Sequence, residues 1–331
     1  MTAVDMPARP LRIGLMLRAV DDVDGQGIYI RKLCEALFQL DSQNQYVAYY
    51  WRPDQVGRFA DRPNVREVVV PGRNKLAWDQ VLVPLASRRD RLDVLFHHKF
   101  SIPLLAPCPT VVQQRGTEYW SHPEFYTGWS GRVGRLYSRF MIPLYCRKAV
   151  RVLTNSDTLG EELVRYVGVP RSKLRTVYAS ADRSFRPIAD SAALAEVRAR
   201  YGLPQEPFLL MVVKGHQVVA RPPAGLPSRY ESFGIPIVEA MACGCPVITA
   251  TTSACPEVAG DAAILVDPDD VEGLASAMYR VSLDDDLAED LRRRGLRRAE
   301  GFSWAESART LLSELAGAAR QGQAAHASHP A

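Results

Sequence analysis

Short apolar runs alternate with helix-spaced apolar residues along the first 180 positions of the chain. Between two such runs, segment 27–40 places Ile30, Leu33 and Leu37 at helical spacing. Repeated strand–helix units predict a parallel sheet covered by helices, an α/β fold. The predicted buried strands are 11–17, 45–51, 65–71, 91–98, 108–114, 149–156 and 173–179.

Caps and glycines mark further elements. Asn155 or Ser156 can cap a helix over 158–168, which Gly168 ends. Ser303 and Glu306 have capping-box spacing at the start of a final helix. Segment 180–191 has no period and is expected to be a linker. The second half is predicted to contain strands 207–213, 245–251 and 262–268 and helices 270–281, 284–302 and 303–321.

Length and composition are those of a globular protein of two domains. The chain has 331 residues, of which 47% are hydrophobic, and a formal net charge of +4 from 41 basic and 37 acidic residues. That balance argues against a dedicated nucleic-acid binder. We expect domains at 1–187 and 188–320 and a disordered tail at 321–331.

The cysteines and the apolar segments indicate the cellular compartment in which the protein folds. The chain lacks an apolar run near the ~18 residues of a membrane span, and its first ten residues lack a signal-peptide core. We therefore expect a cytoplasmic protein with reduced thiols. The six cysteines are Cys34, Cys108, Cys146, Cys243, Cys245 and Cys255.

The stretch "ESFGIPIVEA" at 231–240 carries the strongest chemical signal. Pro236 suits the first turn of a helix and Gly244 its end, so a helix should start directly after "SFG". Its first amides are then unpaired and can bind an anion, and Gly234 lets a ligand approach the backbone closely.

Two glutamates, separated by seven residues, flank that helix start. A carboxylate at Glu239 can accept hydrogen bonds from two vicinal hydroxyls, such as those of a ribose, and Glu231 would face the same crevice. The alternative is that the acidic residues only complement the helix dipole.

Residues 227–267 resemble the retaining glycosyltransferases of family 4, which have two Rossmann-like domains in the GT-B fold. The signature has two glutamates with seven residues between them, with "SFG" after the first and "EAMACGxPV" at the second. Residues 153–187 resemble the end of the first domain and the linker of that family. The resemblance implies a nucleoside-diphosphate sugar donor and neither cofactor nor bound metal. It also implies that Glu239 binds the ribose and that Glu231 binds the donor sugar. The diphosphate would be bound by the amides of Ser232, Phe233, Gly234 and Ile235.

Three places in the first half extend the resemblance or depart from it. Gly25 and Gly27 precede a helix, where the family has a glycine-rich loop beside the diphosphate; a tight turn is the alternative. Arg115 stands where the family commonly has a histidine near the donor sugar. An arginine can still donate hydrogen bonds there, but it cannot titrate near neutral pH. His97 and His98 follow the previous strand and are candidates for the acceptor side, or else surface-loop histidines.

Two further segments complicate this interpretation. Segment 128–151 mixes arginines with aromatics, which fits a solvated helix face or a surface that docks on anionic lipid. Segment 216–226 takes the place of several βα units that carry phosphate-neutralising cations in the family, which leaves only Lys214 and Arg221 there. We therefore expect the second domain to be shortened internally by comparison with usual domain sizes, which predicts weakened transfer.

The expected function is transfer of a hexose or pentose, with retention, from a UDP- or GDP-linked donor to a carbohydrate or lipid-linked acceptor. Polysaccharide or glycolipid synthesis is the expected setting, at the inner membrane face if the lipid contact holds. Two alternatives stay open: a non-catalytic remnant that binds a nucleotide or a partner, and a nucleotide-binding regulator without transfer.

Overall fold

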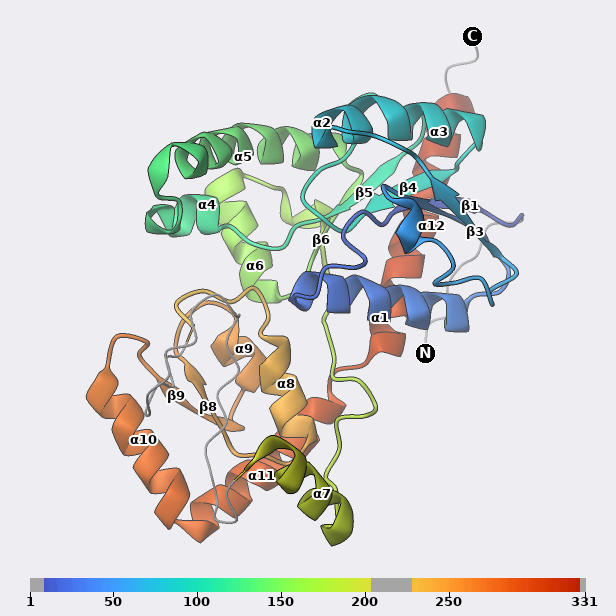
Figure 1. Ribbon diagram of the computed structural model, residues 1–331. Coiled ribbons are helices and arrows are strands. Elements are labelled where there is room, and N and C mark those ends of the chain that lie inside the picture. The colour runs from blue at the N-terminus through green and yellow to red at the C-terminus, as the bar shows by residue number, and fades with distance from the viewer. Residues whose placement is uncertain (1–8, 204–227, 328–331) are drawn as a thin grey trace. The chain divides into compact units, whose positions relative to one another are not determined.

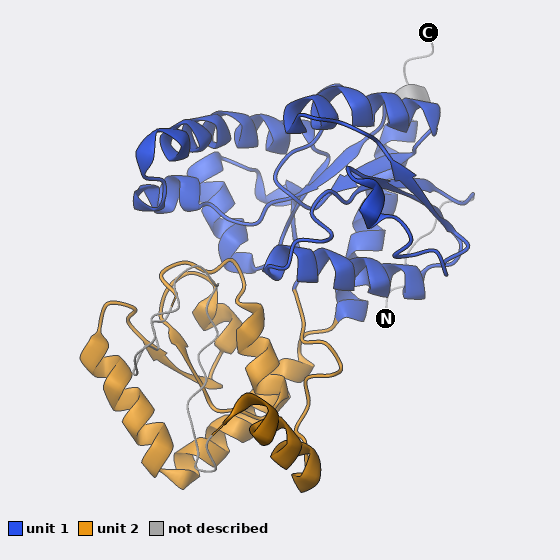
Figure 2. Ribbon diagram, in the orientation of Figure 1, with its two compact units in different colours: residues 1–178, 304–331 blue, residues 179–303 orange. Residues whose placement is uncertain are grey.

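The computed structural model describes residues 9–203 and 228–327. The chain forms two compact units (Figure 2), one of residues 1–178 with 304–331 and the other of residues 179–303. The predicted strand at 207–213 lies outside the described residues, as do Lys214 and Arg221.

Unit 1 is a parallel sheet of seven strands in the order β3-β2-β1-β4-β5-β6-β7 (Figure 1). All seven predicted strands are confirmed, and the fold class is α/β as expected. The strands are β1 (Arg12–Met16), β2 (Gln45–Tyr50), β3 (Val65–Val69), β4 (Val94–His97), β5 (Thr110–Gln113), β6 (Arg151–Thr154) and β7 (Leu174–Thr176).

Helices of unit 1 pack on the sheet through two apolar clusters. One joins Met16 and Tyr49 of the strands to Trp78 and Val83, and the other joins Val112 of β5 to residues of α5. The α-helices of this unit are α1 (Gly25–Leu40), α2 (Lys75–Ala77), α3 (Val83–Arg89), α4 (Glu118–Ser121), α5 (Gly128–Lys148), α6 (Asp157–Glu162) and α12 (Trp304–Ala327). Short 3₁₀ turns lie at Pro53–Gln55, Pro123–Phe125 and Arg171–Lys173, and π turns at Trp78–Leu82 and Leu163–Val167.

The strand register aligns the carboxyl ends of the central strands at one edge. Met16 of β1 pairs with Tyr49 of β2 and with His97 of β4, and His97 pairs with Val112 of β5. In parallel sheets ligands bind outside this edge, so the residues that directly follow these strands are the first candidates for a site.

The final helix differs from the prediction in two ways. We expected residues 321–331 to be a disordered tail, but α12 continues to Ala327, and a Cβ at Gly322 would overlap Pro109. We also assigned this helix to the second domain, whereas it belongs to unit 1 and packs beside α1 (Figure 1). Leu311 and Leu315 are fully buried, and the hydrophobic effect holds this distant segment on unit 1.

Unit 2 is built from helices around a parallel strand pair. In its described part the sheet consists of β8 (Val247–Ala250) and β9 (Ala263–Val266). Gly295 of α11 lets that helix approach Met241 of α8 closely, since a Cβ at Gly295 would lie 3.3 Å from the methionine Cγ. The helices are α7 (Ser191–Tyr201), α8 (Ile235–Ala242), α9 (Cys255–Ala259), α10 (Val271–Leu283) and α11 (Asp285–Glu300).

No helix among the described residues is both long and apolar enough to cross a membrane.

Candidate functional site

The start of α8 in unit 2 forms where the sequence predicts it. Gly234 is the N-cap with a left-handed φ of 87°, and Pro236 lies in the first turn. A Cβ at Gly234 would come within 2.8 Å of Ile237, so both conformation and space favour glycine. No side chain caps this helix, so its first amides can bind an anion.

The loop before α8 is anchored from both sides. The ring of Phe233 is buried and lies edge-to-face against Phe302, with ring centroids 5.4 Å apart. Ser228 donates to Glu231 Oε1 at 2.9 Å, and the amide of Ala254 donates to the Glu231 carbonyl at 3.1 Å. The loop therefore holds its backbone and the Glu231 carboxylate in fixed positions.

Glu239 lies one turn into α8 and is half-buried. Burial raises the pKa of its carboxyl, and the neighbouring charge of Asp182 raises it further. An ionised carboxylate in this position gains by accepting hydrogen bonds, as vicinal hydroxyls would provide. The alternative was that the acidic residues only complement the helix dipole, but the first turn of α8 contains no acidic residue.

The start of α1 differs from the prediction. Gly25 and Gly27 do not precede the helix but form its first turn, and the Asp24 carboxylate caps it by accepting from Gln26 and Gly27 amides at 2.9 and 3.2 Å. A Cβ at Gly27 would collide with the Asp22 carbonyl, which explains this glycine by close backbone packing. Occupation of two amides by an internal carboxylate weakens the case for a phosphate at α1.

Arg115 follows β5 and is buried against α1. Its guanidinium carbon lies 4.2 Å from the ring centroid of Tyr29, and its Nε and Nη1 have no hydrogen-bond partner among the described residues. Burial lowers the pKa of Arg115, while Tyr29 and Asp24 oppose that shift. A buried cation with unused donors is poised to bind an oxyanion.

The Tyr29 hydroxyl ties this region to the strands. It donates to the Val177 carbonyl at 2.7 Å and accepts from Gln113 Nε2 at 2.7 Å. Burial raises the pKa of Tyr29 to about 12, and the positive charge of Arg115 offsets part of the rise. The phenol therefore stays neutral and holds the ring under the guanidinium.

His97 and His98 are fully buried, so the surface-loop alternative is wrong. His97 Nδ1 contacts the Ser101 carbonyl, and its Nε2 has no partner among the described residues. Burial lowers the pKa of both rings well below the usual range, so both are neutral at pH 7. The nearby Met16 backbone raises the pKa of His98 and so offsets part of this lowering. Neither ring nitrogen of His98 forms a hydrogen bond within the described residues.

Unsatisfied buried polar atoms gather at the carboxyl ends of β4 and β5. Each such atom costs about 1–3 kcal/mol. A concentration of them at the edge where ligands bind calls for a functional explanation. The atoms concerned are His97 Nε2, His98 Nδ1 and Nε2, Gln113 Oε1, Gln114 Oε1 and Arg115 Nε and Nη1.

The sequence interpretation missed a cationic group on the same edge. Arg18 follows β1 and donates from Nη1 to Asp79 Oδ1 at 3.0 Å, and Ser101 donates to the other Asp79 oxygen at 2.8 Å. Lys99 follows β4 and pairs with Asp22 at 2.9 Å. Their positions in the sequence could have identified them, because both cations come shortly after predicted strands.

The two aspartates near the start of α1 have partners within unit 1. Asp24 caps α1 and Asp22 pairs with Lys99. Within residues 9–203 and 228–327, no three His, Cys, Asp or Glu side chains are placed to hold a metal ion.

Comparison with known families finds two matching models. The model described as Glycosyltransferase Family 4 matches residues 23–185, and Glycosyl transferases group 1 matches residues 224–298. The second match contains both glutamates and the start of α8, and the first contains Arg115.

Curated relatives match over a short stretch. O-antigen chain mannosyltransferase B of Escherichia coli is 45% identical over 78 residues, which are 24% of this chain and 20% of the relative. Sucrose-phosphate synthase of Zea mays is 33% identical over 93 residues, 28% of this chain and 9% of the relative. The matched stretch thus spans a fifth or less of these relatives.

Solved structures match over almost the whole chain. Anabaena HepE in complex with UDP and glucose has a TM-score of 0.68 at 14% identity and covers 93% of this chain and 100% of its own. A protein from Rickettsia africae has a TM-score of 0.66 at 13% identity, covering 92% and 98%. These structures confirm the GT-B fold class.

Proposed function

We propose that this chain, a glycosyltransferase of GT-B fold, transfers a hexose or pentose with retention from a UDP- or GDP-linked donor to a carbohydrate or lipid-linked acceptor. The observation that carries the proposal is the uncapped start of α8 behind Gly234, with Glu231 and Glu239 on either side. The relatives support it, since their names describe a mannosyltransferase and a sucrose-phosphate synthase, and a structural neighbour was crystallised with UDP-glucose.

The site residues receive the following roles. The amides from Ser232 to Ile235 bind the donor diphosphate, because a helix start without a side-chain cap favours an anion. Glu239 accepts hydrogen bonds from the ribose, and Glu231 from hydroxyls of the donor sugar. Arg115 stabilises the negative charge that grows on the leaving diphosphate.

The reaction needs no protein nucleophile. The acceptor oxygen forms a bond to the anomeric carbon as the bond from that carbon to the diphosphate breaks, and the diphosphate takes the acceptor proton. His97 and His98 would contribute on the acceptor side as neutral hydrogen-bonding groups, since burial keeps their pKa low. We also propose that transfer is slower than in relatives with longer second domains.

Nucleotide titration of the full chain tests this function. Glu239→Gln should weaken UDP or GDP binding roughly tenfold or more, because a hydrogen bond to a charged group contributes about 1.5–3 kcal/mol. Glu272→Gln is the matched control, since this exposed glutamate lies in the first turn of α10 of the same unit.

Hydrolysis of UDP-glucose and GDP-mannose then separates the alternatives. Donor turnover supports the transferase, whereas binding without turnover supports a nucleotide-binding regulator. Absence of nucleotide binding in a folded protein would leave the non-catalytic remnant that binds a partner.

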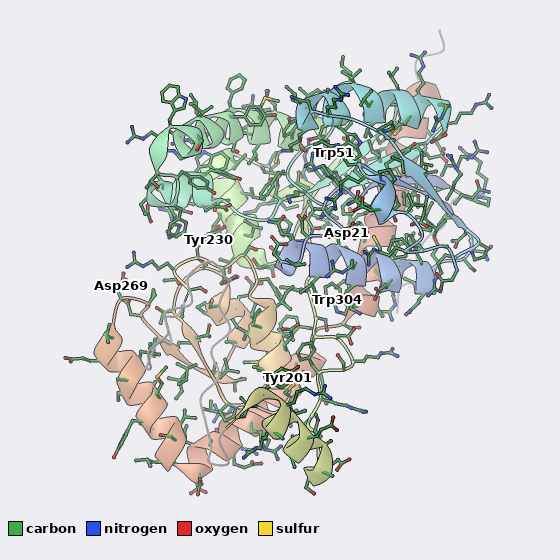
Figure 3. All side chains as sticks on the ribbon, viewed as in Figure 1. Asp21, Trp51, Tyr201, Tyr230, Asp269 and Trp304 are labelled. Atoms are coloured by element: carbon green, nitrogen blue, oxygen red, sulfur yellow. The ribbon has the colours of Figure 1, made fainter. Side chains whose placement is uncertain are left out.

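The exposed side of α5 supports a location in the cytoplasm with a peripheral contact to the inner membrane face. Trp129, Leu136 and Phe140 are 83%, 71% and 69% exposed at helical spacing. Figure 3 shows ring side chains projecting outward from this helix. The helix contains no acidic residue, and its arginines would attract anionic lipid while the rings enter the headgroup region.

A further inference from the structure

A cavity of about 320 Å³ opens at the carboxyl edge of the unit 1 sheet, apart from the Arg115 region. It is lined by Arg18, Ala19, Asp22, Trp51, Arg52 and Lys99. These residues come from the segments that directly follow β1, β2 and β4, three neighbouring strands of the sheet. Ligands of open α/β sheets bind at this edge.

The lining is cationic and partly fixed in place. Arg18 is almost buried and is held by Asp79, with no described partner for its Nε and Nη2. Its guanidinium carbon also lies 5.6 Å from the ring centroid of Trp51. Ser101 fixes the other oxygen of Asp79, so the arginine head is positioned before any ligand arrives.

The remaining cations are more exposed than Arg18 and partly neutralised. Lys99 pairs with Asp22 at 2.9 Å, which leaves two of its donors for a ligand. Arg52 is more than half exposed and has only longer contacts, to Asp54 at 3.3 Å and Asp21 at 3.9 Å. The cavity thus presents three cationic side chains and one carboxylate.

A fourth cation lies near this group. Partial burial lowers the pKa of Lys75, and the positive charges of Arg18 and Lys99 lower it further. An anion in the cavity would relieve that repulsion.

Trp51 adds an apolar wall. Its ring stacks on Trp78 with centroids 6.2 Å apart and planes 11° apart, and its indole N–H donates to the Gly72 carbonyl, so the ring is fixed. A flat aromatic ring suits the apolar face of a pyranose, and Asp22 can accept hydrogen bonds from sugar hydroxyls. Figure 3 marks Trp51 on unit 1.

We propose that this cavity binds the acceptor through an anionic substituent, so that the acceptor is a phosphorylated sugar. Arg18, Arg52 and Lys99 hold the phosphate oxygens, and Trp51 and Asp22 hold the ring. The sugar part of this inference rests on the proposed function, whereas the anion site rests on the cavity alone.

Calorimetric titration of the full chain with glucose 6-phosphate, inorganic phosphate and glucose tests the inference. Glucose 6-phosphate should bind at least about tenfold more tightly than either fragment, and Arg52→Gln with Lys99→Gln should weaken it roughly tenfold or more. Trp51→Leu should weaken glucose 6-phosphate but leave inorganic phosphate unchanged. Thermal unfolding of each variant confirms that it is folded.

Arg88→Gln is the matched control. Arg88 lines another cavity of unit 1, of about 400 Å³, with Arg91 and Leu92, which precede β4 at the opposite edge of the sheet. Equal weakening by Arg88→Gln, or equal affinity for inorganic phosphate and the sugar phosphate, would overturn the inference. Glucose 6-phosphate binding without UDP or GDP binding would instead overturn the proposed function and leave the anion site standing.

Discussion

Glu239 shows how a single carboxylate can be kept for a ligand. It is half-buried on α8, and both burial and Asp182 raise its pKa, so its ionised form is held at a cost in the folded chain. A donor ribose would repay that cost by supplying hydrogen-bond donors.

The pH dependence of stability follows from the sign of that shift. Because the folded-state pKa lies above the usual 4.5, the folded state takes up the proton first as pH falls. Wild type should therefore gain stability relative to Glu239→Gln as pH falls from 7 through the raised pKa, with the full gain below about pH 4.5. Thermal unfolding of both proteins at several pH values measures this, and a constant difference would contradict it.

Arg115 should matter more for transfer than for folding. Its unused donors make burial costly, and the contact with Tyr29 offsets about 0.5–2 kcal/mol of that cost. We expect Arg115→Met to change the free energy of unfolding by less than about 1 kcal/mol while transfer falls ~10²–10³-fold. Denaturant titration and donor turnover measure the two effects.

Arg298 provides the control for that substitution. Its guanidinium lies 4.9 Å from the ring centroid of Phe302, but it also donates to the carbonyls of Val258 and Glu257 at 2.9 and 2.5 Å. Arg298→Met should therefore lower stability by about 1–3 kcal/mol. If Arg115→Met destabilises the chain as much and leaves transfer unchanged, Arg115 is structural.

At the level of single elements, α1 and α8 begin with opposite arrangements. Asp24 closes the start of α1 with its own carboxylate, whereas Gly234 leaves the start of α8 without a side-chain cap. A helix whose first amides are occupied internally has less to offer an anion. This contrast is why we place the donor diphosphate at α8.

Helix α5 should bind anionic membranes through its exposed rings. Trp129→Ser with Phe140→Ser should lower co-sedimentation with vesicles of 30% phosphatidylglycerol in phosphatidylcholine by roughly tenfold or more, because each ring contributes up to ~1.5–3 kcal/mol on burial. The control is Tyr279→Ser with Leu283→Ser, which removes similarly exposed side chains from α10. Equal loss in both double variants, or equal binding to pure phosphatidylcholine, would refute the lipid contact.

For the molecule as a whole, α12 makes unit 1 depend on the end of the chain. Leu315→Ala should cost about 2–5 kcal/mol, since this leucine is fully buried. Hydrogen exchange should then show lost protection in α1, which packs on α12, and retained protection in α10. Leu194→Ala, at an exposed leucine of α7, should change stability by less than about 0.5 kcal/mol. Loss of protection confined to unit 2 would contradict this assignment.

Whole-chain activity also depends on the segment of unit 2 between its described stretches, 179–203 and 228–303. From its prolines and glycine, Pro222, Pro223 and Gly225, we predict first cleavage by a protease between His216 and Ser228, a segment almost wholly outside the described residues. The resemblance to family 4 suggests that this segment replaces cation-bearing units, so the prediction of slow transfer stands with it.

The sequence by itself determined the elements and the most specific motif. Apolar runs predicted the seven strands of unit 1, and Pro236 and Gly244 predicted the bounds of α8, because strand burial and helix ends depend on residues close together in the chain. The same local reasoning left Asn155 or Ser156 as the cap, and the structure shows Ser156 accepting from the Leu159 amide.

Only the tertiary structure decided which polar residues share a site. Arg18 meets Asp79 across 61 positions, and α12 returns to α1 after the whole of unit 2, contacts that no local pattern encodes. Burial likewise decided the state of His97 and His98, whose neutrality comes from the neighbours that exclude water. Periodicity assigns a residue to a strand or a helix, but its partners depend on which distant apolar surfaces pack together.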